Sequence, residues 1–466
     1  MPEHLVIVHR CSLELWPTSS YRQLSTPSWF RPALLVSVLV GLVARLVFVT
    51  TTSRPVALDA VVYRSLATNL ADGKGYVHAV AAQPNKFVAT AGHPPLFSCV
   101  LAVFDLLGLQ SLTEQRVALA VVGSVTVLIM GLLGREVAGP AVGIGAALIA
   151  ALDPLWLGPI GALMSESIYL IIIPLALLLA LRCLAKPTFW RFGALGLVIG
   201  LGVLTRSEAI DFVVLLGVPL LLMVRVSWKS RCTLGVALLV GAALVLGPWL
   251  VRNEVKLGGA VLSTQQGGTL AGSYCASTFD RANPVYGGFS ADCVYGVGVT
   301  LLGYGTPPDR ARGWTELSLD HALTEVAKQY ALNHLGQLPR VVLAREESAW
   351  GLGNQNFQLS LAHAEGRNRT SELIGKGFYW VLVPFVILGT VLLARRAPQR
   401  LLLVLVPVVV AVVTVALVYG STRMRVVAEP SLAVLAATGS VAAGRWLRMH
   451  MPVPERLRAT GLRAAE

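Results

Sequence analysis

Residues 400–419 read RLLLVLVPVVVAVVTVALVY, an apolar segment of the length that an α-helix needs to cross a lipid bilayer. Comparable segments recur along most of the 466-residue chain, in which 55% of the residues are hydrophobic and only 14% are charged. So little polar surface cannot cover a soluble domain of this size. The sequence therefore predicts a helical membrane protein.

Ten segments have the length and flanking charge of transmembrane helices. We predict them at residues 33–52, 116–134, 139–158, 163–182, 190–206, 209–224, 233–251, 377–394, 400–419 and 426–444. The short loops on one predicted side all carry Arg or Lys, and so do the terminal tails, residues 1–32 and 445–466. Because basic loops stay in the cytoplasm, this pattern predicts the orientation and explains the net charge of +13 without a nucleic-acid partner.

Two longer segments would then lie on the extracytoplasmic side. Residues 53–115 follow the first span and are expected to hold short interfacial helices at 60–71 and 95–109. Residues 253–376 are rich in Gly, Pro, Asn, Asp and Tyr, with an amphipathic pattern at 318–335. We expect them to form a small extracytoplasmic domain between spans seven and eight.

The predicted fold is thus an all-α polytopic membrane protein of about ten transmembrane helices. Residues 33–252 and 377–444 would form its membrane region, in the plasma membrane of the cell. Cys275 and Cys293 are the two cysteines of the predicted extracytoplasmic domain, and in an oxidising compartment this pair can close a loop.

Ionisable side chains at membrane depth are costly and usually line a functional, polar cavity. The few in this chain fall near the predicted extracytoplasmic ends of the spans: Asp59, Asp153, Glu166, Arg206, Glu208, Asp211, Arg252, Arg423 and Arg425. A carboxylate there can take a proton from an acceptor hydroxyl, while arginines bind a departing phosphate. This combination suits sugar transfer from a lipid-linked phosphate donor.

Seven short motifs follow one another in the chain. They are Leu58-Asp59-Ala60-Val61-Val62-Tyr63, Leu70-Ala71-Asp72-Gly73 with Gly75-Tyr76, His93-Pro94-Pro95-Leu96, Ser165-Glu166-Ser167, Leu204-Thr205-Arg206, Gly247-Pro248-Trp249-Leu250-Val251-Arg252-Asn253 and Arg423-Met424-Arg425-Val426-Val427-Ala428-Glu429-Pro430. In this order they resemble the integral membrane glycosyltransferases of the GT-C class, the group related to protein O-mannosyltransferases and to the aminoarabinose transferase of lipid A. The resemblance covers most of the chain, but it is weak at residues 1–32 and 254–376.

The resemblance implies roles for individual residues. Asp59, just after the first span, would be the catalytic acid–base residue, and Glu166 the second catalytic acid. Arg423 and Arg425 would contact the lipid phosphate. They stand at positions i and i+2, and in an extended turn both side chains can point to one face. The expected substrate-binding set is completed by Arg206, Tyr63 and His93. The implied partners are a polyprenyl phosphate sugar donor and an envelope glycan, lipid or protein acceptor.

The resemblance leaves the cofactor open. Many relatives carry two adjacent acids at the position of Asp59, whereas here Asp59 is followed by Ala60. The resemblance therefore leaves open whether a divalent cation binds at this loop. The chain shows no strong metal-ligand spacing, and we predict no obligatory zinc site.

Structural roles compete with these functional ones. Asp59 precedes a predicted helix and can cap it by accepting backbone N–H hydrogen bonds. Glu166 can place a negative charge near the start of a helix, where the helix dipole favours it. Arg206 can form a structural ion pair with Glu208. His93 precedes two prolines, so it can have a backbone role in that turn instead of binding a ligand. Arg45, inside the first span, is expected to extend its side chain toward the interface.

The main alternative function is a transporter or lipid flippase. Such proteins also place charges in a membrane cavity, but they often contain inverted repeats and interrupted helices at the midplane. No repeat is evident here, and the polar residues gather at one predicted face. The sequence therefore favours a one-sided enzyme.

Overall fold

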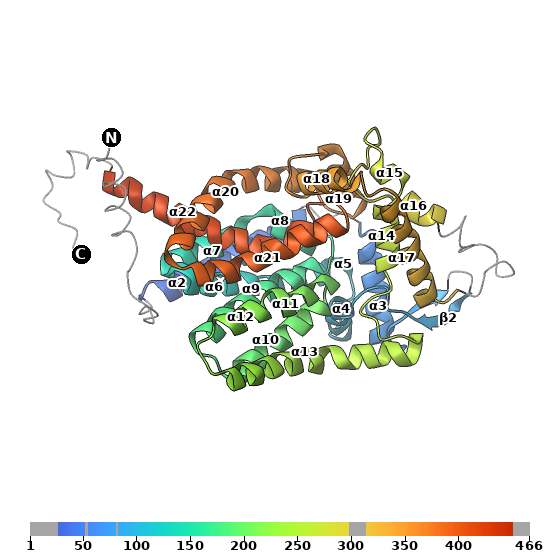
Figure 1. The fold of residues 1–466 in the computed structure, drawn as a ribbon, viewed down its shortest axis with the longest axis horizontal. Coiled ribbons are helices and arrows are strands. Elements are labelled where there is room, and N and C mark those ends of the chain that lie inside the picture. Colours follow the sequence, from blue (N-terminus) through green and yellow to red (C-terminus); the bar gives the residue numbers. More distant parts are fainter. Residues whose placement is uncertain (1–26, 52–54, 81–82, 298–313, 451–466) are drawn as a thin grey trace, which may run out of the picture.

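The computed structural model describes residues 27–51, 55–80, 83–297 and 314–450, so most of both predicted tails lies outside the described residues (Figure 1). Within these ranges, seven helical segments are long and apolar enough to span a membrane. They are α2 (Phe30–Thr51), α5 with α6 (Leu112–Gly123 and Val125–Ala138), α9 (Glu166–Ala185), α13 (Trp228–Leu257), α20 (Arg369–Arg396), α21 (Pro398–Leu417) and η3 with α22 (Met424–Ala428 and Glu429–His450). The polytopic, mostly helical fold is confirmed.

Three of the ten predicted spans take a different form. The segment predicted at 139–158 bends by 45° between α7 (Pro140–Leu152) and α8 (Pro154–Gly161), and the pair would make an eighth span if counted as one. The segment at 190–206 is the shorter helix α10 (Phe189–Val203). The segment at 209–224 is broken into η1 (Ser207–Ile210), α11 (Asp211–Leu215) and α12 (Gly217–Met223). An acid at its start and a glycine at its middle favour these breaks.

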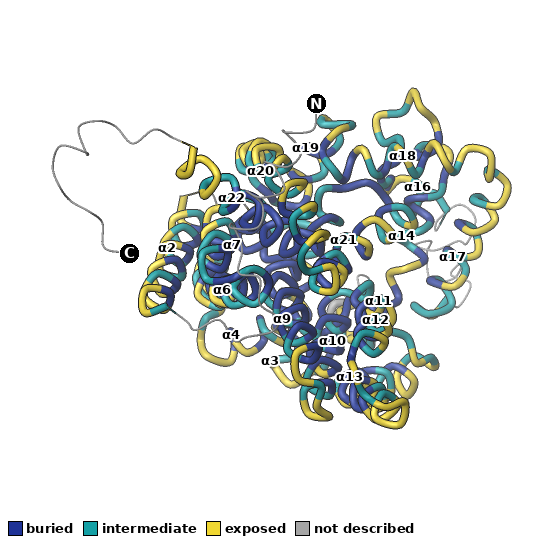
Figure 2. The backbone as a smooth tube through the Cα atoms, turned by 60° about the vertical axis from the view of Figure 1, so that its left-hand side comes forward, coloured by how far each residue is buried: buried dark blue, intermediate teal, exposed yellow. Residues whose placement is uncertain are grey.

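Glycines allow the spans to pack backbone against backbone. A Cβ atom at Gly196 of α10 would overlap the carbonyl oxygen of Leu238 in α13, and one at Gly439 of α22 would overlap that of Phe385 in α20. Such small-residue contacts let helices associate in lipid, where no hydrophobic force drives them together. The spans α9 and α22 are the most enclosed, as their dark course in Figure 2 shows.

Two charged residues within the spans have structural tasks. The Asp153 side chain accepts a hydrogen bond from the backbone N–H of Leu155 at 2.9 Å, so it caps α8 where the chain bends. Arg45 donates to the carbonyl oxygens of Gly41 and Ala150, each at 3.0 Å, and is buried. The expectation that Arg45 extends toward the interface is therefore wrong, because main-chain carbonyls inside the bundle accept hydrogen bonds from both of its Nη atoms.

The segment after the first span contains the two expected short helices, α3 (Asp59–Ala71) and α4 (Leu96–Leu106). Between them lies an antiparallel pair that the sequence did not predict, β1 (Val77–Val80) and β2 (Gln83–Ala89), in which Val77 faces Ala89. Strands this short carry little periodic signal. Arg252 at the end of α13 donates to the carbonyl oxygens of Tyr76, at 2.5 Å, and Thr90, at 2.7 Å, and so anchors both ends of this hairpin.

Residues 258–368, which we call the insert, join α13 to α20. Their described parts, 258–297 and 314–368, gather at one end of the span bundle (Figure 1). They contain α14 (Gln266–Ser273), α15 (Ala276–Phe279), α16 (Ala291–Gly296), α17 (Glu316–Asn333), α18 (Leu338–Ala349) and α19 (Gln355–Ala364). The amphipathic helix predicted at 318–335 is confirmed as α17. A disulfide joins Cys275 to Cys293, which confirms the predicted pairing.

Candidate functional site

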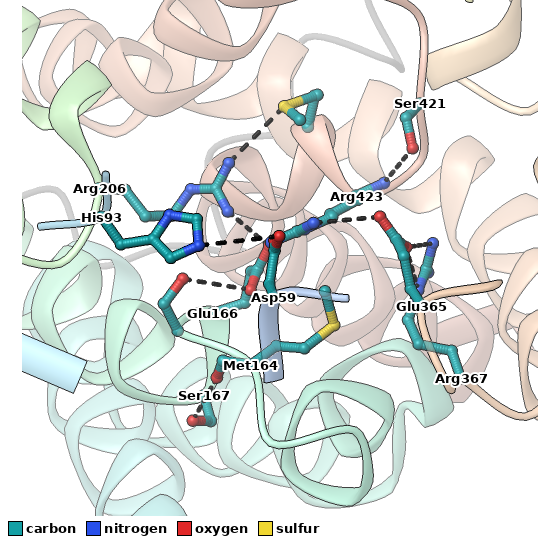
Figure 3. A network of polar contacts seen from close by, with 12 residues as sticks. Asp59, His93, Met164, Glu166, Ser167, Arg206, Glu365, Arg367, Ser421 and Arg423 are labelled. Atoms are coloured by element: carbon teal, nitrogen blue, oxygen red, sulfur yellow. Dashed lines mark hydrogen bonds and ion pairs between the residues drawn. The ribbon is translucent and has the colours of Figure 1, made fainter. Parts of the chain in front are cut away.

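The candidate site lies where several spans end beside the insert. Asp59 follows α2, Glu166 begins α9 and Arg423 immediately precedes η3. Figure 3 shows their side chains converging, together with Arg206 and His93. The structure therefore brings together five residues that the sequence analysis singled out from five separate motifs.

Asp59 is the first residue of α3, and the backbone before it is unusual. Leu58 has φ of 46°, a left-handed conformation that is rare for a residue other than glycine. Such strain persists only where the surroundings hold it, and it concentrates at functional sites. The cap position of α3 is Leu58, whose side chain makes no cap hydrogen bond, and the Asp59 carboxylate forms ion pairs. The capping role considered for Asp59 is therefore not the one observed.

Arg423 is the centre of the cluster. Its Nη2 lies 2.8 Å from Asp59 Oδ2, its Nε pairs with Glu166 Oε1, and its Nη1 lies 3.0 Å from Glu365 Oε1. All three guanidinium nitrogens thus face carboxylates. Because the planar fork fixes these directions, Arg423 holds three acids from different parts of the chain in one arrangement.

Glu166 is the most enclosed acid of the cluster, with a side chain that is 1% exposed. Besides Arg423, it pairs with Arg206 Nη1 at 2.5 Å, and Arg206 Nε pairs in turn with Glu208. Two arginines thus balance the charge of Glu166. The ion pair between Arg206 and Glu208, which the sequence left as an alternative, is present, and Arg206 also belongs to the cluster.

His93 and Tyr63 cover the other side of Asp59. His93 Nε2 lies 3.9 Å from Asp59 Oδ1, and its ring is 4.7 Å from that of Tyr63. The Tyr63 hydroxyl donates to Ser165 Oγ at 3.3 Å, next to Glu166 in the chain. Burial lowers the pKa of His93, so its imidazole is neutral at pH 7. Both residues lie against the candidate acid.

Asp59 differs from the other acids in its exposure. Its side chain is 28% exposed, whereas those of Glu166 and Glu365 are 1% and 5% exposed. Burial is the largest effect and acts to raise the pKa of Asp59, but the lowering effects, led by the charge of Arg423, together outweigh it, so the pKa lies below its ordinary value. Asp59 is therefore an ionised carboxylate that is partly exposed.

Arg425 lies apart from this cluster. From the sequence, Arg423 and Arg425 were expected to point to one face of an extended turn, but residues 424–428 form the 3₁₀ helix η3. Arg425 is buried, pairs with Glu429 at 2.8 Å and lies over the ring of Tyr379, 3.9 Å from its centroid. The expected shared face is therefore wrong, because a 3₁₀ turn separates the two side chains.

Two neighbouring cavities border the cluster. The first has about 360 Å³ of empty space and is lined by Glu166, Arg367 and Arg423, among others. The second has about 410 Å³ and is lined by Arg425, Lys376 and Glu372 together with amide, hydroxyl and apolar side chains. Both include Leu155 and Thr422 in their walls, so they adjoin each other.

Three charged residues near the site were not expected from the sequence: Glu365, Arg367 and Lys376. All three lie in or next to the segment where the family resemblance was weak. Glu365 and Arg367 are an acid and a base that flank Gly366 shortly before a predicted span, and this pattern is not specific to a functional site. Among the described residues, no group of three or more His, Cys, Asp or Glu side chains is arranged to hold a metal ion.

Comparisons with known proteins support the resemblance. Residues 92–251 match the family model described as dolichyl-phosphate-mannose-protein mannosyltransferase. A search of curated proteins finds no significant relative. The fold is similar to that of the archaeal oligosaccharyltransferase AglB from Archaeoglobus fulgidus, in complex with an inhibitory peptide and a dolichol-phosphate, with a TM-score of 0.55 and 14% identity.

That alignment covers 94% of this chain and 52% of AglB, so the chain spans about half the length of that enzyme. The apo form of the Archaeoglobus fulgidus oligosaccharyltransferase gives a TM-score of 0.53 at the same identity and coverage. ArnT from Cupriavidus metallidurans, bound to undecaprenyl phosphate, aligns with a TM-score of 0.42 and 13% identity over 90% of this chain and 78% of that chain. The chain has the fold of GT-C membrane glycosyltransferases, as the sequence motifs implied.

Proposed function

We propose that this protein is a glycosyltransferase that moves a sugar from a polyprenyl phosphate donor to an extracytoplasmic acceptor, which is an envelope glycan, lipid or protein. The observation that carries the proposal is the Asp59 carboxylate. It is ionised, partly exposed and held by Arg423 in a cluster whose other acids are buried. The fold shared with GT-C enzymes supports the same reaction class.

The proposed reaction uses Asp59 as a general base. Its Oδ2 is paired with Arg423, which leaves Oδ1, on the side of His93, to accept the proton of an acceptor hydroxyl. The acceptor oxygen then forms a bond to the anomeric carbon of the sugar. The bond from that carbon to the phosphate oxygen breaks, and its electron pair leaves with the polyprenyl phosphate. Glu166 acts by fixing Arg206 and Arg423.

The cationic residues divide into two tasks in this proposal. Arg423 and Arg206 hold the acids, since carboxylates occupy all three guanidinium nitrogens of Arg423 and two of those of Arg206. Arg425 and Lys376 line the neighbouring cavity, and we place the carrier phosphate there. Lys376 lies near the start of α20, whose neighbouring Ile374 is 58% exposed, so a lipid tail would lie along that helix. Tyr63 and His93 would line the sugar side of Asp59.

The basic loops indicate on which side of the membrane the site would lie. The basic loops predict that the ends of the spans near the insert face the extracytoplasmic side of the plasma membrane. Asp59 and the insert lie at the same end, so the reaction would occur there. A disulfide between Cys275 and Cys293 fits an oxidising compartment.

A transporter or lipid flippase remains the alternative from another class. A transporter places its charged site near the bilayer midplane, between repeats. Here the acids and arginines lie at the ends of α2, α9 and α20 and beside η3. A cluster at one end of the spans favours a one-sided enzyme.

The test is to incubate the purified protein with a panel of polyprenyl phosphate sugars and candidate acceptors. We expect at least one donor to be consumed, with equal amounts of free polyprenyl phosphate and glycosylated acceptor measured by mass spectrometry. Movement of the lipids across a vesicle membrane without any cleavage of a donor would instead support the flippase.

A further inference from the structure

We infer that the connector between α19 and α20, Glu365-Gly366-Arg367, positions Asp59 for the reaction. The inference rests on the proposed function, in which Asp59 is the base. The connector belongs to the insert in sequence, but it contacts the site from two directions, through the side chain of Glu365 and through the backbone at Gly366. Figure 3 shows Glu365 and Arg367 beside Arg423.

The first contact is the ion pair between Glu365 and Arg423. Glu365 Oε1 lies 3.0 Å from Arg423 Nη1, while the Nη2 atom of the same guanidinium holds Asp59. Because the guanidinium is planar and rigid, the position of Nη1 fixes that of Nη2. Glu365 therefore fixes the position at which Arg423 binds Asp59. It also attracts the guanidinium in competition with Asp59.

Arg367 holds Glu365 from behind. Its Nη2 lies 2.8 Å from Glu365 Oε2, and its Nη1 lies 2.6 Å from Glu372 Oε1 in the first turn of α20. Glu365 and Arg367 are both buried. Ion pairs in such surroundings are weakly screened by water, so they keep a defined geometry. The chain of contacts runs from α20 through Arg367, Glu365 and Arg423 to Asp59.

The second contact is made by the backbone. Gly366 has φ of +75°, and a Cβ atom there would lie 3.0 Å from the carbonyl oxygen of Pro55. Pro55 begins the short segment that leads through the strained Leu58 to Asp59. A residue with a side chain at position 366 would be strained and would push against that segment. Glycine at 366 thus lets the connector lie directly against the approach to the base.

The chemical consequence concerns the strength of the base. Arg423 shares its charge among three carboxylates, and this sharing leaves Asp59 less tightly bound than a single pair would. Without Glu365, the guanidinium would move toward Asp59 and lower its pKa further, because the cation would stabilise the ionised form more strongly. Asp59 would then be a weaker base for the acceptor hydroxyl.

The test compares Glu365→Gln with the wild-type protein in two measurements. We expect kcat of sugar transfer to fall by about tenfold with KM for both substrates unchanged, a part of the ~10²–10⁴ that a general base commonly contributes. We also expect slower carbodiimide labelling of Asp59, measured by mass spectrometry, because the reagent needs the protonated carboxyl. The labelling does not require turnover, so it tests the connector even if no donor is found and the proposed function fails.

Matched variants separate position from stability. Glu325→Gln removes an exposed glutamate of α17, paired with Lys328 at 3.4 Å, and should change neither measurement. Gly366→Ala should lower kcat, whereas Gly258→Ala, with a similar φ of +78° but no atom near the new methyl group, should not. If Glu365→Gln and Gly366→Ala lowered only thermal stability, with kcat and the labelling of Asp59 unchanged, the connector would have no positioning role.

Discussion

Asp59→Asn is expected to lower sugar transfer by about 10²–10⁴-fold, the range that general-base catalysis commonly supplies. Asparagine has nearly the same shape as aspartate, but its amide cannot accept the acceptor's proton. Arg423 would keep Glu166 and Glu365 as partners, so the cluster should stay assembled. The measurement is kcat with a saturating donor, on protein shown to be folded by size-exclusion chromatography and thermal unfolding.

The control is Asp292→Asn, since Asp292 is an exposed acid of α16 in the insert and should be fully active when replaced. Turnover of Asp59→Asn within a factor of a few of wild type would eliminate Asp59 as the base. A large rise in KM with little change in kcat would instead assign Asp59 to substrate binding.

The parts of the site that sequence predicted are those at the ends of apolar spans. Asp59, Glu166 and Arg423 stand out because a charge next to a long apolar segment is costly and therefore informative. Their partners could not be paired from sequence, because the ion pair between Glu166 and Arg423 joins residues 257 positions apart. The helices α3, α4 and α17 were predictable for a related reason, since each has a local pattern and a clear end.

The remaining differences have local physical causes. The segment at 209–224 was expected to be a span because its average hydropathy is high. In the structure the helix is interrupted twice, so the segment forms the three short helices η1, α11 and α12. Arg423 and Arg425 were expected to share a face because alternate residues do so in an extended chain, and a 3₁₀ helix removes that relation. Glu365 and Arg367 lie in an irregular connector, where neither periodicity nor spacing marks a buried ion pair.

Arg423→Gln is expected to move the acidic limb of the pH–rate profile to higher pH. In the wild type the lowering effects, led by the charge of Arg423, together outweigh burial, and the pKa of Asp59 lies below its ordinary value. Without the cation, burial raises the pKa of Asp59, and the neighbouring Glu166 raises it further. The ionised base is then lost as pH falls through the raised pKa, at values where the wild type is fully active.

The size of this effect depends on how far the pH lies below the raised pKa of Asp59. Each full pH step below that pKa lowers the ionised fraction of the carboxyl by about tenfold. The variant should therefore be most impaired near pH 5 and should recover part of its rate near pH 8. Breaking buried ion pairs also costs about 3–5 kcal/mol of stability, so the rates must be referred to the folded fraction.

Arg423→Lys completes the experiment. It keeps the positive charge but lacks the planar fork, so it can hold one or two of the three carboxylates in place. We expect its acidic limb to stay near that of wild type while kcat is lowered, which separates the charge of Arg423 from its geometry. The donor KM decides between two roles. If Arg423 acts through Asp59, KM for the donor stays constant in both variants, whereas direct contact with the carrier phosphate would raise it in both and leave the pH profile unmoved.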